Sequence, residues 1–509
     1  MDNTDNAPVN IITYNDIVAL RKSGDYMKAY EACLTVKSQD PSNQWVDNQL
    51  GWCLYDMLKA YAQAQSAVQF LSRLKELADL GLPQNNFVMD SVPFQIHALI
   101  KDCEQNGMLF DDILDELFER AKEINFNPSG KHYSMLLTAF LKAKQWHGLK
   151  DFIEWWNLDN LKATDFQCFE SQQGRKLMSL AEKAYINYAK LLIQGIADSS
   201  TDSVIAGNFV EKISQLAIKH PEYQYPTYFQ AKLMMALGEK EGVVKILLPF
   251  VIRKQRDYWV WDILGDAVDD EDLRLSCYCK ALSCPAKDDY LVKMHLKMCN
   301  VLKARALFNE ARTEFHVAAQ IYRKNGWRFP YQYLDYENES WYQNAVAKDN
   351  NADFYSSNTQ LAEQLLFSEK PLVTILITYV NMEKKMANFV STDHRKGFFS
   401  FKKLPKKQWP KQDKLYACRM DRTLNDEFAE VYVCERLKSE ESVENVLVRH
   451  AEGELKIIAN GAGFVGDIFV QPPMLSNLSN RQQVKVKALL KYNKKKCTWG
   501  WSAISVVAI

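Results

Sequence analysis

Hydrophobic residues recur with a helical period over most of the chain. From about residue 12 to residue 366, apolar side chains return every three or four positions, which places them on one face of an α-helix. After Lys370-Pro371 the pattern changes to short β-branched and aromatic runs. The chain is therefore predicted to fold as a long helical region followed by a β-rich region.

The β-rich region divides into two sets of five short runs. Five short strands in about 65 residues suit a small closed barrel, because closure leaves no exposed sheet edge. Residues 439–452 are expected to connect the two sets. The predicted strands are residues 372–380, 386–390, 397–401, 414–420 and 428–434 in the first set, and 453–458, 463–465, 467–470, 484–492 and 501–507 in the second.

Small and bulky residues alternate at fixed offsets in several of the predicted helices. Small side chains let antiparallel helices approach closely, and a bulky one fills the gap between neighbouring pairs. This spacing resembles that of tetratricopeptide repeats (TPR), which implies an all-α superhelical solenoid over residues 10–367 that binds a protein partner. A generic α-helical domain is the alternative. The groups are Ala29, Cys33 and Val36 before Pro41; Leu50-Gly51; Trp261, Leu264 and Gly265; Tyr278 and Ala281 before Pro285; and Ala311, Phe315 and Ala318.

The middle of the helical region has no assignable repeat register. Residues 90–250 keep a helical pattern throughout, and residues 133–140 and 146–156 predict one more helix pair. Pro221 and Pro226 predict a turn.

Charge is divided between the two regions although the whole chain is neutral, with 63 Lys+Arg and 63 Asp+Glu. Residues 371–509 hold 23 basic and 14 acidic side chains, a net charge of +9, so residues 1–370 carry −9. Basic clusters attract phosphate backbones, although lysine-rich loops also serve solubility. The surplus is concentrated in Lys402, Lys403, Lys406, Lys407 and Lys411, and in Lys491, Lys494, Lys495 and Lys496.

The second strand set contains three linked motifs in order. They are Gly453-Glu454-Leu455-Lys456, Asn460-Gly461-Ala462-Gly463-Phe464-Val465 and Asp467-Ile468-Phe469-Val470-Gln471. These motifs resemble those of cold-shock domains, which implies an OB-fold barrel over residues 450–509. The resemblance also implies that Lys456, Phe464 and Phe469 contact single-stranded nucleic acid, whose bases stack on aromatic rings. Trp499, near the last strand, either adds a stacking surface or belongs to the core.

This copy departs from the cold-shock pattern in its first two strands and after the third. Ile457 and Ile458 stand where the family has aromatics, Ala462 replaces a phenylalanine, and Gln471 replaces a histidine. Each stacked base contributes about 1–3 kcal/mol, so these replacements are expected to weaken binding.

The first strand set also resembles cold-shock domains, but more loosely. Thr378-Tyr379-Val380-Asn381 matches the aromatic first strand, and Gly397-Phe398-Phe399-Ser400-Phe401 matches the third. The resemblance implies a degenerate cold-shock-like OB-fold over residues 371–437, beside a lysine-rich rim. In the alternative interpretation, the phenylalanines face the barrel core. The candidate nucleic-acid-binding residues here are Tyr379, Phe389, Phe398, Phe401, Lys402 and Lys403.

No motif points to catalysis or to a metal. The chain has no Gly-x4-Gly-Lys-Ser/Thr loop, no His-Glu-x-x-His and no Cys-x-x-Cys, and its eight histidines lie far apart. Its 11 scattered cysteines are typical of reduced thiols in the cytoplasm. The polar start Met1–Asp5 predicts no secretory signal, and no apolar run approaches the roughly 20 residues of a membrane span. We expect no enzymatic activity, no metal and no cofactor.

Together these patterns predict a non-enzymatic cytoplasmic scaffold or adaptor. A TPR-like array would bind a protein partner, and tandem OB-folds would bind RNA or single-stranded DNA. This architecture is similar to that of bacterial stress- or defence-associated TPR–OB proteins. Two alternatives stay open: a subunit of a larger complex that contacts only protein, and an enzyme with its site in the helical array.

Overall fold

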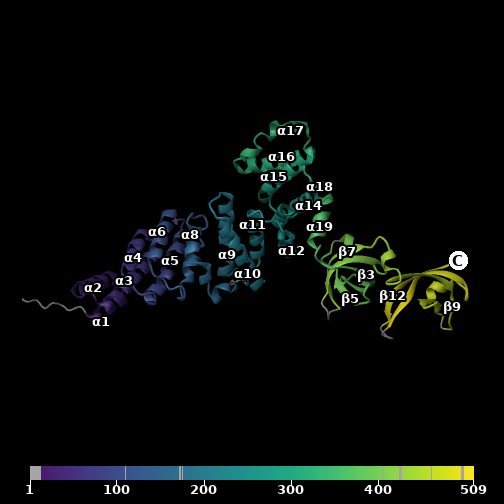
Figure 1. Cartoon of the computed structure of the whole chain (residues 1–509), viewed down its shortest axis with the longest axis horizontal. Helices are drawn as coiled ribbons and strands as arrows, with labels where there is room; N and C mark the ends of the chain where they lie inside the picture. Colours follow the sequence, from purple (N-terminus) through teal and green to yellow (C-terminus); the bar gives the residue numbers. More distant parts are fainter. Residues whose placement is uncertain are drawn as a thin grey trace, which may run out of the picture. The chain divides into compact units, whose positions relative to one another are not determined.

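The chain is mainly helical up to residue 366 and rich in strands from residue 372, as the hydrophobic pattern predicts (Figure 1). The computed structural model describes residues 13–108, 110–170, 174, 176–404, 406–422, 427–459, 461–493 and 498–509. The chain splits into two compact units, Met1–Phe250 and Val251–Ile509, called here the first and second unit.

Stacked helix pairs build the first unit. Helix α3 packs against α2, α4 and α5, α5 packs against α7, and α4 packs against α6. The predicted pair around residues 133–156 is confirmed as α7 and α8, and the predicted turn separates α10 from α11. The helices are α1 Tyr14–Ser23, α2 Tyr26–Gln39, α3 Gln44–Gln63, α4 Ala67–Asp79, α5 Phe87–Gln105, α6 Asp111–Glu123, α7 Ser134–Phe140, α8 Leu149–Trp156, α9 Leu180–Ala197, α10 Ser203–Lys219 and α11 Pro226–Ala236, with α12 Val243–Lys254 at the boundary between the units and short 3-10 helices at Leu158–Asn160 and Ala163–Phe166.

One element of the first unit corrects the helical prediction for residues 90–250. Strand β1 (Phe169–Glu170) pairs antiparallel with β2 (Lys176–Leu177) and forms a short hairpin before α9. Gly174 between the strands has a φ of +71°, a left-handed conformation that interrupts a helix and suits a turn. The segment is polar and lacks the apolar repeat that would hold a helix against its neighbours.

The helical part of the second unit is also built of pairs. Helices α13 and α14 pack together, α15 packs against α16, and α14 also contacts α15, α18 and α19. These helices are α13 Tyr258–Ala267, α14 Glu271–Leu282, α15 Asp288–Ala304, α16 Phe308–Asn325, α17 Ser340–Asn344, α18 Ala352–Ser357 and α19 Gln360–Leu366, with 3-10 helices at Tyr331–Tyr333 and Tyr336–Asn338.

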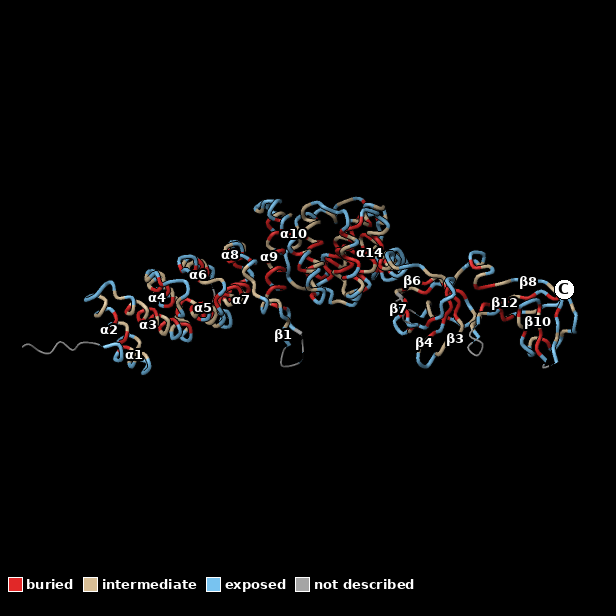
Figure 2. The backbone as a smooth tube through the Cα atoms, turned by 60° about the horizontal axis from the view of Figure 1, so that its bottom comes forward, coloured by how far each residue is buried: buried red, intermediate tan, exposed pale blue. Residues whose placement is uncertain are grey.

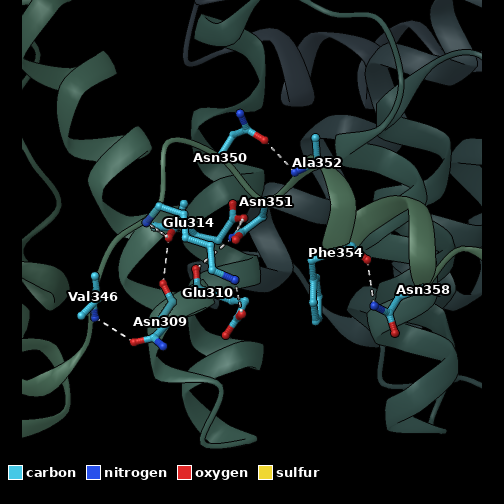
Figure 3. A network of polar contacts seen from close by, with 11 residues as sticks. Asn309, Glu310, Glu314, Val346, Asn350, Asn351, Ala352, Phe354 and Asn358 are labelled. Atoms are coloured by element: carbon cyan, nitrogen blue, oxygen red, sulfur yellow. Dashed lines mark hydrogen bonds and ion pairs between the residues drawn. The ribbon is translucent and has the colours of Figure 1, made fainter.

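A buried carboxylate ties the loop before α18 to helix α16 (Figure 3). Glu314 is 1% exposed and lies 2.6 Å from Nδ1 of His295 on α15. Asn351 and Tyr355 also donate to this carboxylate. A buried charge is costly unless hydrogen-bonded partners surround it, and here three elements supply them. The network therefore fixes α15, α16 and α18 relative to one another.

The first barrel follows the helices and contains the five predicted strands. Its sheet order is β5-β4-β3-β6-β7, and every neighbouring pair is antiparallel. An isolated parallel bridge between Phe398 and Phe428 joins the two edge strands. This order and closure fit the Greek-key barrel of an OB-fold. The strands are β3 Leu372–Asn381, β4 Met386–Ser391, β5 Lys396–Ser400, β6 Leu415–Arg422 and β7 Ala429–Arg436.

The second barrel has the same strand connections. Its order is β8-β12-β13-β11-β10-β9, and only β11 and β13 run parallel. Strands β8 and β9 flank Leu455, so the two ends of this order are one continuous stretch of chain and the sheet closes on itself. The strands are β8 Val448–Glu454, β9 Lys456–Ile457, β10 Gly463–Val465, β11 Ile468–Val470, β12 Gln483–Asn493 and β13 Thr498–Ala508.

The first strand of the second barrel begins earlier than the sequence predicts. It starts at Val448 instead of Gly453, so the connector between the barrels is shorter than residues 439–452. The cause is the long strand β12, which pairs with β8 from Glu454 back to Val448.

The two barrels share apolar packing through this connector. Leu376, Val390 and Leu415 point away from the core of the first barrel, yet they are buried against the core cluster of the second. Val443 and Leu447 of the connector belong to the same cluster. Figure 2 shows buried residues within the helix stacks and inside both barrels. One side of the outer surface of the first barrel is therefore closed to solvent.

An aromatic stack and an ion pair link the helices of the second unit to the first barrel. Phe367 stacks on Tyr432 with ring centroids 5.0 Å apart, and Lys370 donates to Asp421. Burial alone would raise the pKa of the Asp421 carboxyl, but the bonds from Lys370 and Tyr432 hold this pKa below its ordinary value. The Lys370–Asp421 pair thus helps to seat the first strand of the barrel.

The small residues that suggest repeats should lie at close helix contacts, and a substitution at Gly265 tests this. A Cβ at Gly265 would lie 2.4 Å and 2.6 Å from two ring carbons of Tyr278. The Tyr278 ring is held by its hydroxyl, which donates to Asp266. We expect Gly265→Ala to lower the free energy of unfolding by about 1–3 kcal/mol, because overpacking forces α13 and α14 apart. Urea denaturation followed by fluorescence measures this change.

Gly207 is the matched control on α10. Nothing lies within 4 Å of a Cβ built there, and its backbone is helical. Gly207→Ala should be neutral or should stabilise the chain by about 0.5–1 kcal/mol, since alanine loses less backbone entropy in a helix. A Gly265→Ala chain as stable as the parent would mean that this helix contact is not tight.

Candidate nucleic-acid interface

Exposed aromatic side chains form a row across the outer face of the first barrel. Tyr379 on β3 pairs with Asn388 on β4, which pairs with Phe398 on β5. The bridge from Phe398 continues this line to Phe428, the residue before β7. The exposed fractions are 52% for Tyr379, 36% for Phe398 and 45% for Phe428. We call these three residues the aromatic row.

The pleat of the strands decides which aromatics belong to the row. Neighbouring residues on a strand point to opposite faces of a sheet. Ala387 and Phe389 flank Asn388 and lie in the core, and so does Phe399 beside Phe398. Ile377 and Tyr379 are two residues apart and would share a face in a regular strand. A bulge between them shifts the pairing by one residue, so Ile377 points into the core and Tyr379 points outward.

The prediction that Phe389 and Phe401 bind nucleic acid is wrong, because both side chains are buried. Phe389 is 1% exposed and Phe401 is 0% exposed, and both belong to the core of the first barrel. A ring without an exposed face cannot stack on a base. For these two residues the core interpretation holds, whereas Tyr379 and Phe398 are accessible.

Lysines gather along one flank of the aromatic row, at the strand ends beyond it. Lys402 and Lys403 come two and three residues after the end of β5 and are exposed, as the lysine-rich rim requires. The backbone N–H of Phe401 donates to the carbonyl of Lys385, which brings the β3–β4 turn with Lys384 beside them. Lys403 is 3.5 Å from Glu430, whereas Lys384, Lys385 and Lys402 form no ion pair among the described residues.

The second barrel presents a smaller aromatic surface. Phe464 on β10 pairs with Phe469 on β11, and their ring centroids are 5.6 Å apart at 62°. Both are partly exposed and point away from the core, which takes the alternate residues Val465, Ile468 and Val470. Lys456 pairs with Phe464 on its other side and is exposed. These three residues occupy one line across three strands.

Trp499 lies where the two barrels meet. Its ring is 5.0 Å from Tyr492 and 6.0 Å from His394, which belongs to the β4–β5 turn of the first barrel. The ammonium of Lys396 lies 4.9 Å from the centre of the Tyr492 ring. Trp499 is partly buried, so it serves mainly as a contact between the barrels and less as a free stacking surface.

Sequence reasoning overlooked three members of this surface. Phe428 was predicted only as the start of a strand, because its position beside Phe398 depends on barrel closure between distant segments. Lys384 and Lys385 stand in the turn after the first strand, and the Glu383-Lys384-Lys385 run is a signal that could have identified them.

Part of the predicted basic cluster falls outside the described residues. Lys494, Lys495 and Lys496 lie outside the described residues, as does the side chain of Lys407. Within the described part of the chain, no group of three or more His, Cys, Asp or Glu side chains could hold a metal ion. None of the described helices is long and apolar enough to cross a membrane.

Comparison with protein families identifies two segments. Residues 449–506 match the model for S1/CSD-like domain 2 of the TOTE conflict systems, which confirms the cold-shock-like character of the second barrel. Residues 224–362 match a domain of unknown function (DUF7017). No curated protein matches the chain. Neither family model names a tetratricopeptide repeat, so that assignment of the helices stays a prediction.

The opposite burial of two neighbouring aromatics gives a stability test of the barrel register. We expect Phe389→Ala to lower the free energy of unfolding by about 3–5 kcal/mol, because it empties a core position. Tyr379→Ala should change it by less than about 0.5 kcal/mol, since half of this side chain is already in solvent. Thermal and urea unfolding of the two variants measure the difference, and equal losses would contradict the register.

Proposed function

We propose that the chain is a non-enzymatic cytoplasmic scaffold that binds single-stranded RNA or DNA through the outer faces of its C-terminal barrels. The observation that carries this proposal is the aromatic row, three exposed rings aligned across β3, β5 and the residue before β7. Single strands expose the faces of their bases, and every base can stack on an aromatic ring.

The dimensions of the row support stacking of more than one base. Adjacent strands lie about 4.8 Å apart, so Tyr379 and Phe398, two strands apart, are separated by roughly 10 Å. Asn388 between them offers an amide that can donate to and accept from base edges. The lysines along the flank of the row supply positive charge for the phosphates of the stacked bases.

The second barrel adds to the same activity with a reduced surface. Its family match supports nucleic-acid contact, but of the aromatic positions in the cold-shock motifs only Phe464 and Phe469 keep a ring. Ile458 is 43% exposed where the family has an aromatic. We therefore expect the first barrel to contribute most of the affinity.

The helical region supplies the protein-binding half of the proposed scaffold. We assign it as a TPR-like array because its helices stack in pairs and its small residues are buried at the contacts. Ala29, Ala311 and Ala318 are all 0% exposed. A stacked array of this kind presents an extended surface to a partner.

Binding should depend strongly on salt. We expect the full-length chain to bind labelled single-stranded RNA and DNA more tightly than duplex DNA, and to lose affinity as salt rises, because bound lysines release counterions. The variant Lys384→Gln, Lys402→Gln, Lys403→Gln should reduce the slope of log K against log salt by about 2, at roughly 0.7 per contact. Fluorescence anisotropy at several salt concentrations measures both effects.

Stacking is tested by removing two rings of the row. We expect Tyr379→Ala with Phe398→Ala to weaken single-strand binding by about 2–6 kcal/mol, at about 1–3 kcal/mol per base, without unfolding the barrel. Tyr331→Ala is the matched control, since Tyr331 is an 87% exposed aromatic outside the barrels. Binding that survives the double change would remove the row from the interface. An absence of binding by the parent chain at low salt would favour the alternative of a subunit that contacts only protein.

A further inference from the structure

A groove in the first unit combines an apolar floor with lysines. It has a volume of about 770 Å³ and lies between the α5–α6 turn, the segment after α7, the β1–β2 hairpin and the start of α9. Leu114, Leu141 and Trp146 are buried beneath it, and Phe169 and Met178 at its edge are 58% and 39% exposed. The groove can therefore receive apolar side chains.

The cations of the groove continue along the neighbouring helices. Lys142, Lys144 and Lys183 line the groove itself. Lys190 lies two turns after Lys183 on α9, and a separation of seven residues keeps both on one helix face. The lysine stripe, as we call the set, comprises Lys101 on α5, Lys142 and Lys144 after α7, Lys183 and Lys190 on α9, and Lys232 on α11.

Carboxylates neutralise little of this stripe. Lys142 lies 3.7 Å from Glu104, and the other lining acid, Asp111, faces His147 at 3.5 Å. Lys101, Lys144, Lys183, Lys190 and Lys232 form no ion pair among the described residues. This is notable in a region of net negative charge, residues 1–370.

The members of the stripe are close enough to repel one another. Partial burial lowers the pKa of Lys190, and the ammonium groups of Lys144 and Lys232 lower it further. Burial likewise lowers the pKa of His97 on α5, with added repulsion from Lys142 and Lys101, although Asp102 opposes it. Like charges held together without a counter-charge favour an anionic ligand, which relieves the repulsion.

We propose that the groove and the lysine stripe dock an extended acidic segment of a partner protein, in which carboxylates alternate with apolar side chains. The carboxylates pair with the stripe, and the apolar side chains enter the groove beside Phe169 and Met178. This inference rests on the proposed role of the helices as a protein-binding array, and it gives that partner a chemistry.

The apolar floor favours a peptide over a nucleic acid. A phosphodiester backbone offers charge but no aliphatic side chain that fills a groove over Leu114, Leu141 and Trp146. Helix α5 packs against α7 and α9 packs against α11, and the groove lies between these two pairs. At 8–10 Å between packed helices, the stripe from α5 to α11 is roughly 30 Å long. An extended peptide of about ten residues spans that length at roughly 3.3 Å per residue.

The test uses the full-length chain and a fluorescein-labelled peptide of about ten residues that alternates Glu with Leu and Phe. One control peptide replaces Glu by Gln, a second replaces Leu and Phe by Ser, and a labelled single-stranded oligonucleotide forms a third arm. We expect only the acidic–apolar peptide to bind tightly, with affinity that falls as salt rises. Lys144→Glu with Lys183→Glu should weaken it by at least about tenfold, because like charges then face the peptide.

The matched control variant is Lys75→Glu with Lys219→Glu, which has the same change of net charge on α4 and α10, outside the stripe. It should bind the acidic–apolar peptide as the parent does. Peptide binding that is absent in the parent, or unchanged by Lys144→Glu with Lys183→Glu, overturns the inference. If the Ser peptide binds as tightly as the acidic–apolar peptide, the groove contributes nothing beyond charge, and this result also overturns the inference.

The oligonucleotide arm separates this inference from the proposed function. If Lys144→Glu with Lys183→Glu abolishes oligonucleotide binding while Tyr379→Ala with Phe398→Ala does not, the stripe binds nucleic acid and the peptide proposal is wrong. If the peptide fails but the oligonucleotide binds through the aromatic row, the docking inference fails alone. If the peptide binds and the oligonucleotide does not, the nucleic-acid proposal fails alone.

Discussion

The pairing register of β3, β4 and β5 decides which aromatic side chains of the first barrel can meet a ligand. Side chains alternate between the two faces of a strand, so a shift by one residue would exchange the whole core set for the whole surface set. With the observed register, Phe389 and Phe399 fill the barrel while Tyr379 and Phe398 face solvent. The bridge between Phe398 and Phe428 closes the barrel and extends the exposed line to a third ring. The same register turns Leu376 and Val390 toward the connector, where burial against the second barrel holds the two barrels together.

Charge is organised on a finer scale than the regional totals indicate. The barrels place lysines next to exposed rings, a combination suited to single strands, in which phosphate and base alternate. The helical region has the opposite net charge, yet its lysine stripe gathers six ammonium groups beside an apolar groove, and among the described residues only Lys142 of the six forms an ion pair. The two surfaces differ in what accompanies the charge: flat aromatic faces on the barrels, and a concave apolar floor among the helices. This difference underlies the assignment of a nucleic acid to one surface and an acidic protein segment to the other.

Local patterns predicted the elements well, and non-local contacts account for what was missed. The β-branched run at residues 372–380 and the alternation after it place the strands of the first barrel to within two residues. The phenylalanines of that barrel were ambiguous, because the run Phe398-Phe399-Ser400-Phe401 lacks the polar alternation that would distinguish the faces. Phe428 needed knowledge of the closure between β5 and β7. The lysine stripe could not be predicted from local patterns, since Lys101 and Lys232 join one surface only when α5 packs against α7, α9 packs against α11, and the groove brings the two pairs together.

The central claim is that the outer face of the first barrel contacts single-stranded nucleic acid. Ultraviolet cross-linking of the full-length chain to a thiouridine-substituted single strand, with the linked peptides identified by mass spectrometry, tests it most directly. We predict cross-links in the peptides that contain Tyr379, Phe398 and Phe428, and their loss when an unlabelled single strand competes. Cross-links confined to the helices, or no cross-links above those of a duplex control, would contradict the account.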